Sequence, residues 1–370
     1  MYALLMAVVA EVASSAPARY LWKSSPIQWA YGMASCTYGV FLQKLHMTHL
    51  DEVDFVGGPA KGLTAIVTGP TSGIGMETAA ALARRGATVI LACRSVARGE
   101  ELKSRIEGQM ARLGHDAPRL EVWRLDLTSL ASVREFCARW DAQTRPLNIL
   151  VNNAGIYSMN APREETADGF EAHMGCNHLG HYLLTLSMLP SLRLGAEHAG
   201  GSHARVVCVA SDVHMMATRG LRMSDPHFRL PKSYVSLAAY AQSKLANILF
   251  TRELRRRLGP GSKIEAYAVH PGMVMTNVVR TLPAFIKSAY QLLLGFVLLT
   301  PSQGARASIY AATAPGARVE ATSTNGYFDA NARPTHTSPS GDDTAQAAWL
   351  WRWSAEQVML PPGLKLVMEQ

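Results

Sequence analysis

Short apolar runs rich in β-branched residues alternate with longer stretches of helical periodicity through the middle of the chain. The runs predict strands at residues 63–67, 88–92, 120–124, 148–151, 204–209 and 264–269, and the stretches predict helices at residues 76–85, 130–140, 170–189 and 239–258. Parallel neighbouring strands need a crossover connection, and helices in the crossovers cover both faces of the sheet. The alternation therefore predicts an α/β fold, with a doubly wound parallel sheet in a single domain.

A glycine-rich turn joins the first predicted strand to the first predicted helix, with glycines at the spacing G-x-x-x-G-x-G. Gly69 permits a tight bend, Gly73 lets the backbone approach a pyrophosphate, and Gly75 lets the helix pack on the strand. Because a helix N-terminus offers amide donors and a positive dipole end, the turn predicts a dinucleotide-phosphate site. The residues expected to contact the cofactor here are Gly69, Thr71, Ser72, Gly73, Ile74 and Gly75.

The end of the second predicted strand indicates which dinucleotide is bound. An NAD site places an acid about 20 residues past the glycines, where it accepts from the ribose 2′-hydroxyl. Here Arg94 stands at that position, and no carboxylate occurs before Glu100. Since the Arg fork suits a phosphate, Arg94 indicates NADP(H), with an exposed loop residue as the alternative. Asp126 and Leu127 follow the third strand and are expected beside the adenine, although Asp126 could equally cap a helix beginning near Thr128.

Tyr240 and Lys244 lie four residues apart, on one face of the predicted helix at 239–258. Of the twelve tyrosines, only Tyr240 is followed by Lys at this spacing. A phenol with a pKa of about 10 acts near neutral pH only when a nearby positive charge lowers that pKa. The pair therefore predicts an acid–base centre.

Further motifs follow in order along the chain: Asn152-Asn153-Ala154-Gly155, Asn177, Ser211, the pair Tyr240 and Lys244, and Pro271-Gly272. Together with the glycine turn, these motifs resemble the short-chain dehydrogenase/reductase family over roughly residues 62–314, and they imply its Rossmann fold. Within the family the chain is similar to the retinol-dehydrogenase-like members and, more closely, to the plant "forever young" oxidoreductase branch. Residues 67–75, 177–179, 300–304, 344–346 and 360–361 suggest that branch.

The resemblance implies a role for each of four polar residues. Tyr240 is the general acid in reduction and the base in oxidation, while Lys244 lowers the pKa of Tyr240 and holds the nicotinamide ribose. Ser211 bonds the substrate oxygen, and Asn177 supports a water-linked proton relay. The resemblance also places Asn152, Ala154, Gly155, Tyr240, Lys244, Pro271, Gly272 and Thr276 at the cofactor, whereas Asn153 is structural.

Composition argues against several other classes of protein. The formal charge of +8 suits an anionic membrane surface or a phosphorylated cofactor, and it would suit nucleic acid. No basic run with interleaved aromatic residues occurs, so no nucleic-acid partner is expected. The five cysteines are odd in number and widely spaced, which fits neither a zinc pattern nor a secreted disulfide framework. His178 and His181 lack further ligands at metal-site spacing, so they are interpreted as ordinary helix residues and no metal is expected.

The domain organisation is predicted as an N-terminal extension at 1–58, a catalytic domain at 59–330 and a C-terminal helical tail at 331–370. The extension carries two apolar stretches and a single acid, Glu11. A signal anchor, a membrane-surface segment and a transit peptide fit it comparably, with a plain soluble extension as the alternative. A further apolar segment, near 280–300 in the catalytic domain, predicts a lid over the substrate or a membrane-facing patch, with a buried core helix as the alternative.

The sequence thus predicts an NADP(H)-dependent oxidoreductase that transfers a hydride between the cofactor and a CH–OH or carbonyl group. The expected substrate is a small lipophilic alcohol or carbonyl compound such as a retinoid, prenol, steroid or fatty aldehyde. A nucleotide-binding scaffold or regulator of the same fold, with little turnover, is the alternative. A membrane surface and a second copy in a homodimer are the expected partners. The expected location is the endoplasmic reticulum membrane, or a chloroplast or other organelle reached through the N-terminal segment.

Overall fold

The computed structural model describes residues 34, 58–157, 161–198, 204–274, 298–315, 317–320, 324–361 and 364. Nearly all of the predicted N-terminal extension therefore lies outside the described residues. The same holds for Thr276 and for most of the apolar segment near 280–300. The described chain on either side of that segment comes together, because Val274 and Leu299 form an isolated parallel bridge.

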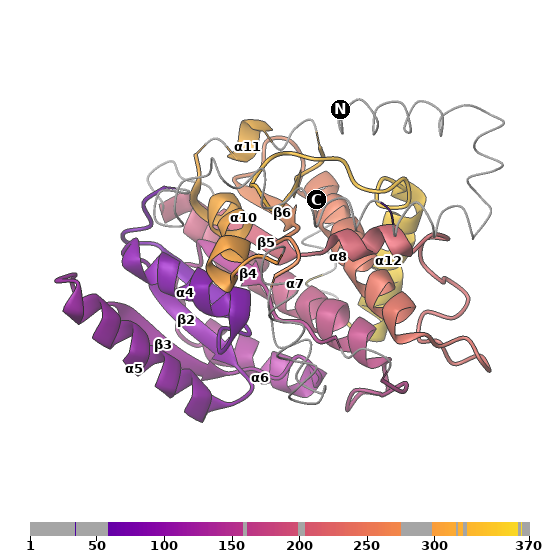
Figure 1. Ribbon diagram of the computed structural model, residues 1–370, viewed down its shortest axis with the longest axis horizontal. Helices are drawn as coiled ribbons and strands as arrows, with labels where there is room; N and C mark the ends of the chain where they lie inside the picture. The colour runs from indigo at the N-terminus through magenta and orange to yellow at the C-terminus, as the bar shows by residue number, and fades with distance from the viewer. Residues whose placement is uncertain are drawn as a thin grey trace.

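A seven-stranded parallel sheet forms the centre of the molecule, in the order β3-β2-β1-β4-β5-β6-β7 (Figure 1). The strands are β1 (Thr64–Thr68), β2 (Thr88–Cys93), β3 (Arg119–Arg124), β4 (Ile149–Asn152), β5 (Ala204–Val209), β6 (Ile264–Val269) and β7 (Tyr327–Phe328). The order runs outward in both directions from β1 and β4, which makes their carboxyl ends the topological switch point. The six predicted strands and the doubly wound parallel sheet are confirmed.

Helices connect the strands and cover the sheet. They are α4 (Gly73–Arg84), α5 (Val96–Arg112), α6 (Leu130–Asp141), α7 (Gly180–His198), α8 (Ser236–Leu258), α10 (Pro301–Thr313), α11 (Ala317–Glu320) and α12 (Thr344–Gln357). A π-helical turn, η2 (Met174–Leu179), leads into α7, and a 3-10 helix, η3 (Asp212–Met216), follows β5. The four predicted helices are present, whereas α5 and α10 were not predicted.

Alternate residues of each strand face two separate hydrophobic cores, as the two-residue period of a strand requires. On one face Ile66 packs with side chains of α6, α7 and α8, including Trp140. On the other face Val67 packs with side chains of α4, α5 and α10, including Leu82 and Ala307. Both faces of the sheet are therefore buried, and only its edges and strand ends remain available for a site.

Helix α12 continues the first core instead of forming a separate layer, and it lies beside α8 in Figure 1. The Trp351 ring stacks on Phe250 of α8 with a centroid separation of 5.8 Å. The Tyr182 hydroxyl of α7 donates to the Trp351 carbonyl over 3.0 Å. The helix of the predicted C-terminal tail is therefore packed into the catalytic domain. Within the described residues, no helix has both the length and the apolar character needed to cross a membrane.

Candidate active site

The predicted cofactor and catalytic residues gather at one edge of the sheet, because each follows the carboxyl end of a strand or lies on a helix that reaches that edge. Gly69 follows β1, Arg94 follows β2, Asp126 follows β3, Ser211 follows β5 and Pro271 follows β6. Parallel strands present all their carboxyl ends on the same side. In open α/β sheets this side, at the switch point, is where ligands bind.

The glycine turn has the backbone that its spacing predicts. Gly69 and Gly73 have φ angles of 63° and 57°, in the region that favours glycine. A Cβ on Gly75 would lie 2.3 Å from Asn153 Nδ2 and 2.5 Å from the Gly69 carbonyl oxygen. Ser72 is the N-cap of α4 and its side chain makes no capping bond, so it does not occupy the first amides of the helix. The turn therefore fits a phosphate group at the start of α4.

Thr68 and Asn153 hold this turn against the end of β4. The Asn153 side-chain amide donates to the Thr68 carbonyl over 2.8 Å, and the Asn153 backbone N–H donates to Thr68 Oγ1 over 2.9 Å. The Ala154 N–H donates to the same hydroxyl. Thr68 was not among the predicted site residues. Its position at the last residue of a strand, directly before the first glycine, is the signal that would have found it.

Four side chains from three elements, η2, η3 and α8, converge beside the turn. Lys244 Nζ donates to the Val209 carbonyl over 2.9 Å and lies 5.6 Å from the centroid of the Tyr240 ring. Ser211 is the N-cap of η3, and its hydroxyl is hydrogen-bonded to Tyr240. Asn177 Oδ1 accepts from the Ile156 N–H over 2.8 Å. The sequence prediction that these side chains share one site agrees with this geometry.

Gly155 packs closely against two of these side chains. A Cβ at Gly155 would lie 3.4 Å from both Asn177 Oδ1 and Lys244 Nζ. Asn152, at the end of β4, donates from Nδ2 to Thr185 Oγ1 over 2.8 Å. Its Oδ1 is buried without a hydrogen-bond partner among the described residues. The glycine turn, this Oδ1 atom of Asn152 and the adjoining Lys244 fit a dinucleotide that runs along the carboxyl ends of the strands.

The π-helical turn explains how Asn177 is held. His181 Nδ1 contacts the Asn177 carbonyl at 3.1 Å, and His181 Nε2 contacts Thr68 Oγ1 at 2.9 Å. His181 therefore joins Asn177 to the end of β1, which the sequence interpretation as an ordinary helix residue missed. His178 faces elsewhere and contacts Ser354 of α12. Such π-turns inside helices are frequent at functional sites. No group of three or more potential metal ligands occurs within the described part of the chain.

Burial controls the protonation of the site. Burial raises the pKa of Tyr240 to about 12, although its hydrogen bond with Ser211 acts in the opposite direction. Burial also lowers the pKa of Lys244 to about 8, because the charged form loses hydration. The pKa of Tyr240 therefore lies above its ordinary value, and a lowering of that pKa by Lys244 stays a prediction. At neutral pH Tyr240 is therefore a phenol.

The remaining predicted cofactor residues differ in their surroundings. Arg94 is exposed directly after β2. Asp126 Oδ1 accepts from the Thr128 N–H and hydroxyl, at 3.0 Å and 2.7 Å. The alternative that Asp126 caps the helix is wrong, because α6 begins at Leu130 and Ser129 is its N-cap. Leu127 is buried against the start of α7, where a Cβ on Gly180 would meet its carbonyl oxygen. Pro271 and Gly272 follow β6, and Gly272 has a φ of 81°.

Comparisons with known proteins identify the family of this site. A family model for short chain dehydrogenase matches residues 63–222. Polyprenol dehydrogenase of Mus musculus is 45% identical over 258 residues, which cover 70% of this chain and 73% of that protein. The chain belongs to the short-chain dehydrogenase family. Retinol dehydrogenase 12 of Homo sapiens is 38% identical over 308 residues, covering 82% of this chain and 90% of that protein.

A solved structure has a similar fold. An uncharacterized protein from Mycobacterium Paratuberculosis is 33% identical, and the match covers 84% of this short-chain dehydrogenase and 97% of that chain with a TM-score of 0.62. The predicted family and its retinol-dehydrogenase-like character are confirmed, while the plant branch stays a prediction. The protein is thus an oxidoreductase of this family and is related to enzymes that act on alcohols. The fold of the family binds a nicotinamide cofactor.

Proposed function

We propose that this short-chain dehydrogenase transfers a hydride between NADP(H) and the CH–OH or carbonyl group of a lipophilic substrate. The observation that carries the proposal is the convergence of Tyr240, Lys244, Ser211 and Asn177 beside the glycine turn. Among these groups are a proton donor, a cation and a hydroxyl, which are the groups that carbonyl reduction requires.

The preference for NADP(H) rests on the end of β2. Arg94 is exposed there, and the next carboxylate along the chain, Glu100, lies within α5. An arginine fork binds the 2′-phosphate of NADP(H) by charge-assisted hydrogen bonds, whereas an acid at this position would favour the free hydroxyl of NAD(H). We assign Asp126 and Leu127 to the adenine side. Pro271, Gly272 and Thr276 are assigned to the nicotinamide side.

Tyr240 is the proton donor to the substrate oxygen in reduction, and its phenolate is the acceptor in oxidation. When bound, the nicotinamide supplies the hydride in reduction and takes it in oxidation. The raised pKa of Tyr240 keeps the phenol protonated at neutral pH, which suits donation. Loss of the proton leaves a phenolate in a half-buried position, and Lys244, fixed by its bond to the Val209 carbonyl, is the adjacent cation that stabilises it. Ser211 stabilises charge on the substrate oxygen.

The proposed substrate is a retinoid, prenol, steroid or fatty aldehyde type of compound. The names of the two relatives, polyprenol dehydrogenase and retinol dehydrogenase 12, support a long apolar alcohol. The Tyr157 ring, 4.6 Å from the Tyr240 ring between centroids, supplies an apolar wall beside the phenol. We also propose that residues 1–58 attach or target the protein to a membrane, that the segment near 280–300 covers the substrate, and that the enzyme forms a homodimer at the membrane surface.

The test is NADPH consumption with a panel of long-chain aldehydes and ketones in detergent, for the unmutated protein and for Tyr240→Phe. The phenylalanine keeps the ring and removes the proton donor. Turnover should fall by at least ~10²-fold while NADPH binding survives. Near-normal turnover by Tyr240→Phe would show that the assignment is wrong. Cofactor binding without turnover by the unmutated protein, across the whole panel, would favour the scaffold alternative.

A further inference from the structure

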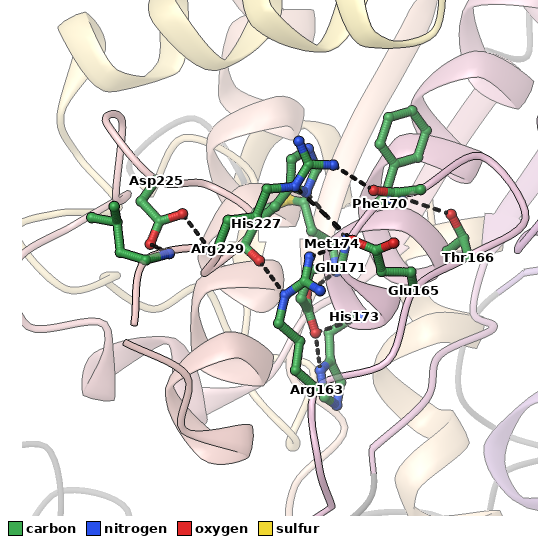
Figure 2. Close-up of polar contacts among 12 residues, drawn as sticks. Arg163, Glu165, Thr166, Phe170, Glu171, His173, Met174, Asp225, His227 and Arg229 are labelled. Atoms are coloured by element: carbon green, nitrogen blue, oxygen red, sulfur yellow. Dashed lines mark hydrogen bonds and ion pairs between the residues drawn. The ribbon is translucent and has the colours of Figure 1, made fainter. Parts of the chain in front are cut away.

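A buried carboxylate lies close to the proposed proton donor, at the start of the helix that carries Asn177. Glu171 is fully buried and directly precedes the helix, which begins at residue 172. Its two oxygens accept from the backbone N–H groups of His173 and Met174, at 3.1 Å and 2.8 Å (Figure 2). These bonds cap the helix, and the positive end of the helix dipole stabilises the carboxylate.

The same carboxylate also holds a side chain that the cap does not need. His173 Nδ1 lies 2.7 Å from Glu171 Oε1, and the His173 ring is buried. Since an ionised carboxylate only accepts hydrogen bonds, this contact places the ring proton on Nδ1. Any residue at position 173 would supply the backbone N–H for the cap. The imidazole is therefore an addition to the helix start, and its orientation is fixed by Glu171.

The imidazole is directed toward the proposed catalytic tyrosine. The His173 ring lies edge-on to the Tyr240 ring with a centroid separation of 6.0 Å, and it lies 6.3 Å from the Tyr157 ring. Tyr157 and Tyr240 are themselves 4.6 Å apart. The Tyr240 ring thus contacts two aromatic side chains, of which His173 is the one tied by a hydrogen bond to a buried charge.

A second histidine, His227, holds the backbone of Glu171 (Figure 2). The Glu171 backbone N–H donates to His227 Nδ1 over 3.2 Å. The His227 ring stacks on Phe170 with a centroid separation of 5.4 Å, and the Arg163 guanidinium donates to the His227 carbonyl over 2.8 Å. Burial lowers the pKa of His227, which agrees with its Nδ1 acting as an acceptor. Glu171 is therefore held on both its backbone and its side chain.

We propose that Glu171 and His173 are positioning residues for the reaction, which orient the Tyr240 ring through the edge-on contact of the imidazole. This inference rests on the proposed role of Tyr240 as proton donor. The phenol must meet the substrate oxygen while keeping its hydrogen bond to Ser211, and a displacement of about 1 Å at a reacting group can cost on the order of 10²-fold in rate. A ring tethered to a buried carboxylate limits such a displacement.

The experiment compares His173→Phe with His178→Phe. His173→Phe keeps an aromatic ring and both backbone bonds of the cap but removes the tether to Glu171. His178 is the matched control, because it is equally buried, lies on the same helix and bonds to Ser354 but contacts Tyr182 and Phe250 instead of Tyr240. For His173→Phe we expect kcat to fall at least ~10-fold, with the KM for NADPH within about twofold. The solvent deuterium isotope effect on kcat should rise, because proton transfer is impaired.

His178→Phe should lower the melting temperature without changing kcat per folded molecule or the isotope effect. Equal effects of the two variants on kcat would show that Glu171 and His173 only cap the helix, and this result would overturn the proposal. If His173→Phe does not fold, His173→Asn replaces it, since it keeps a donor for Glu171 and removes the ring; turnover within twofold of the unmutated protein would then overturn the proposal. Normal turnover by Tyr240→Phe would instead refute the underlying function, so the two failures are distinguishable.

Discussion

Substitution of Gly75 by alanine should destabilise this protein, although helix propensity alone predicts the opposite. Alanine in a helix interior is more favourable than glycine by roughly 1 kcal/mol. Gly75 is in the first turn of α4, where a Cβ would lie 2.3 Å from Asn153 Nδ2 and 2.5 Å from the Gly69 carbonyl oxygen. Neither distance is possible for real atoms, so the Asn153 side chain or the turn must move.

The magnitude follows from the bonds that this movement breaks. The Asn153 amide donates to the Thr68 and Gly69 carbonyls, and each buried carbonyl left without a partner costs about 1–3 kcal/mol. After the propensity gain is subtracted, the expected loss is about 1–5 kcal/mol in the free energy of unfolding. NADPH binding should weaken as well, because the displaced turn is the proposed phosphate site.

Urea unfolding followed by circular dichroism measures the change, with Gly108→Ala as the matched control. Gly108 lies in the helix α5, where a Cβ would meet only the far end of the Arg112 side chain at 3.9 Å. That substitution should be neutral or stabilising by up to about 1 kcal/mol. A Gly75→Ala protein that is as stable as the Gly108→Ala protein, with unchanged NADPH affinity, would refute both the packing argument and the placement of the cofactor.

Three further predictions concern cofactor choice, pH and membranes. Arg94→Asp should weaken NADPH binding at least ~10-fold in a fluorescence titration, because a repelling carboxylate replaces the charged fork; equal affinities of the unmutated protein for NADPH and NADH would contradict this. Lys244→Met should increase the free energy of unfolding below pH 8, and this increase should shrink as pH rises from about 8 to about 10.5. Between these pH values Lys244 is protonated in the unfolded chain but not in the folded chain, so the unmutated protein becomes more stable as pH rises. A gain in urea midpoint that is the same at pH 7 and pH 10 would contradict the lowered pKa. Full-length protein should bind anionic liposomes, while versions lacking residues 1–50 or carrying Leu293→Lys should bind less; Leu298 is buried in the structure, so its substitution would not test the membrane contact. A wholly soluble full-length protein would end that proposal.

The strands and the Tyr240/Lys244 helix were predictable because each carries its signal within a short window. A buried parallel strand is a continuous β-branched run, and all six such runs became strands. The unpredicted helix α10 also carried a local signal. Thr300 and Gln303 form a capping box with Pro301 at the first helical position, a pattern visible in the sequence before it was seen in the structure.

Other features depend on contacts that no local pattern records. Strand β7 is two residues long and exists because β6 offers it an edge. The π-turn at η2 inserts a residue into what the sequence shows as one apolar periodicity from 170 to 189. Asp126 is followed closely by two hydroxyl residues that can cap a helix, and only the observed backbone shows that Ser129 is the cap.

The raised pKa of Tyr240 shows why site chemistry was the hardest part to predict. A charge four residues away along a helix is visible in the sequence, so Lys244 was expected to decide the ionisation of the phenol. Burial is not visible in the same way, since it depends on Tyr157, on Ser211 and on the packing of α8 against the sheet. In the folded protein burial lowers the pKa of Lys244 to about 8, so at neutral pH Lys244 is still mostly an ammonium while Tyr240 is a neutral phenol. On the proposed function, a substrate that takes the proton from Tyr240 leaves a negative charge that the Lys244 ammonium can balance, so the two groups form an ion pair during the reaction and not before it.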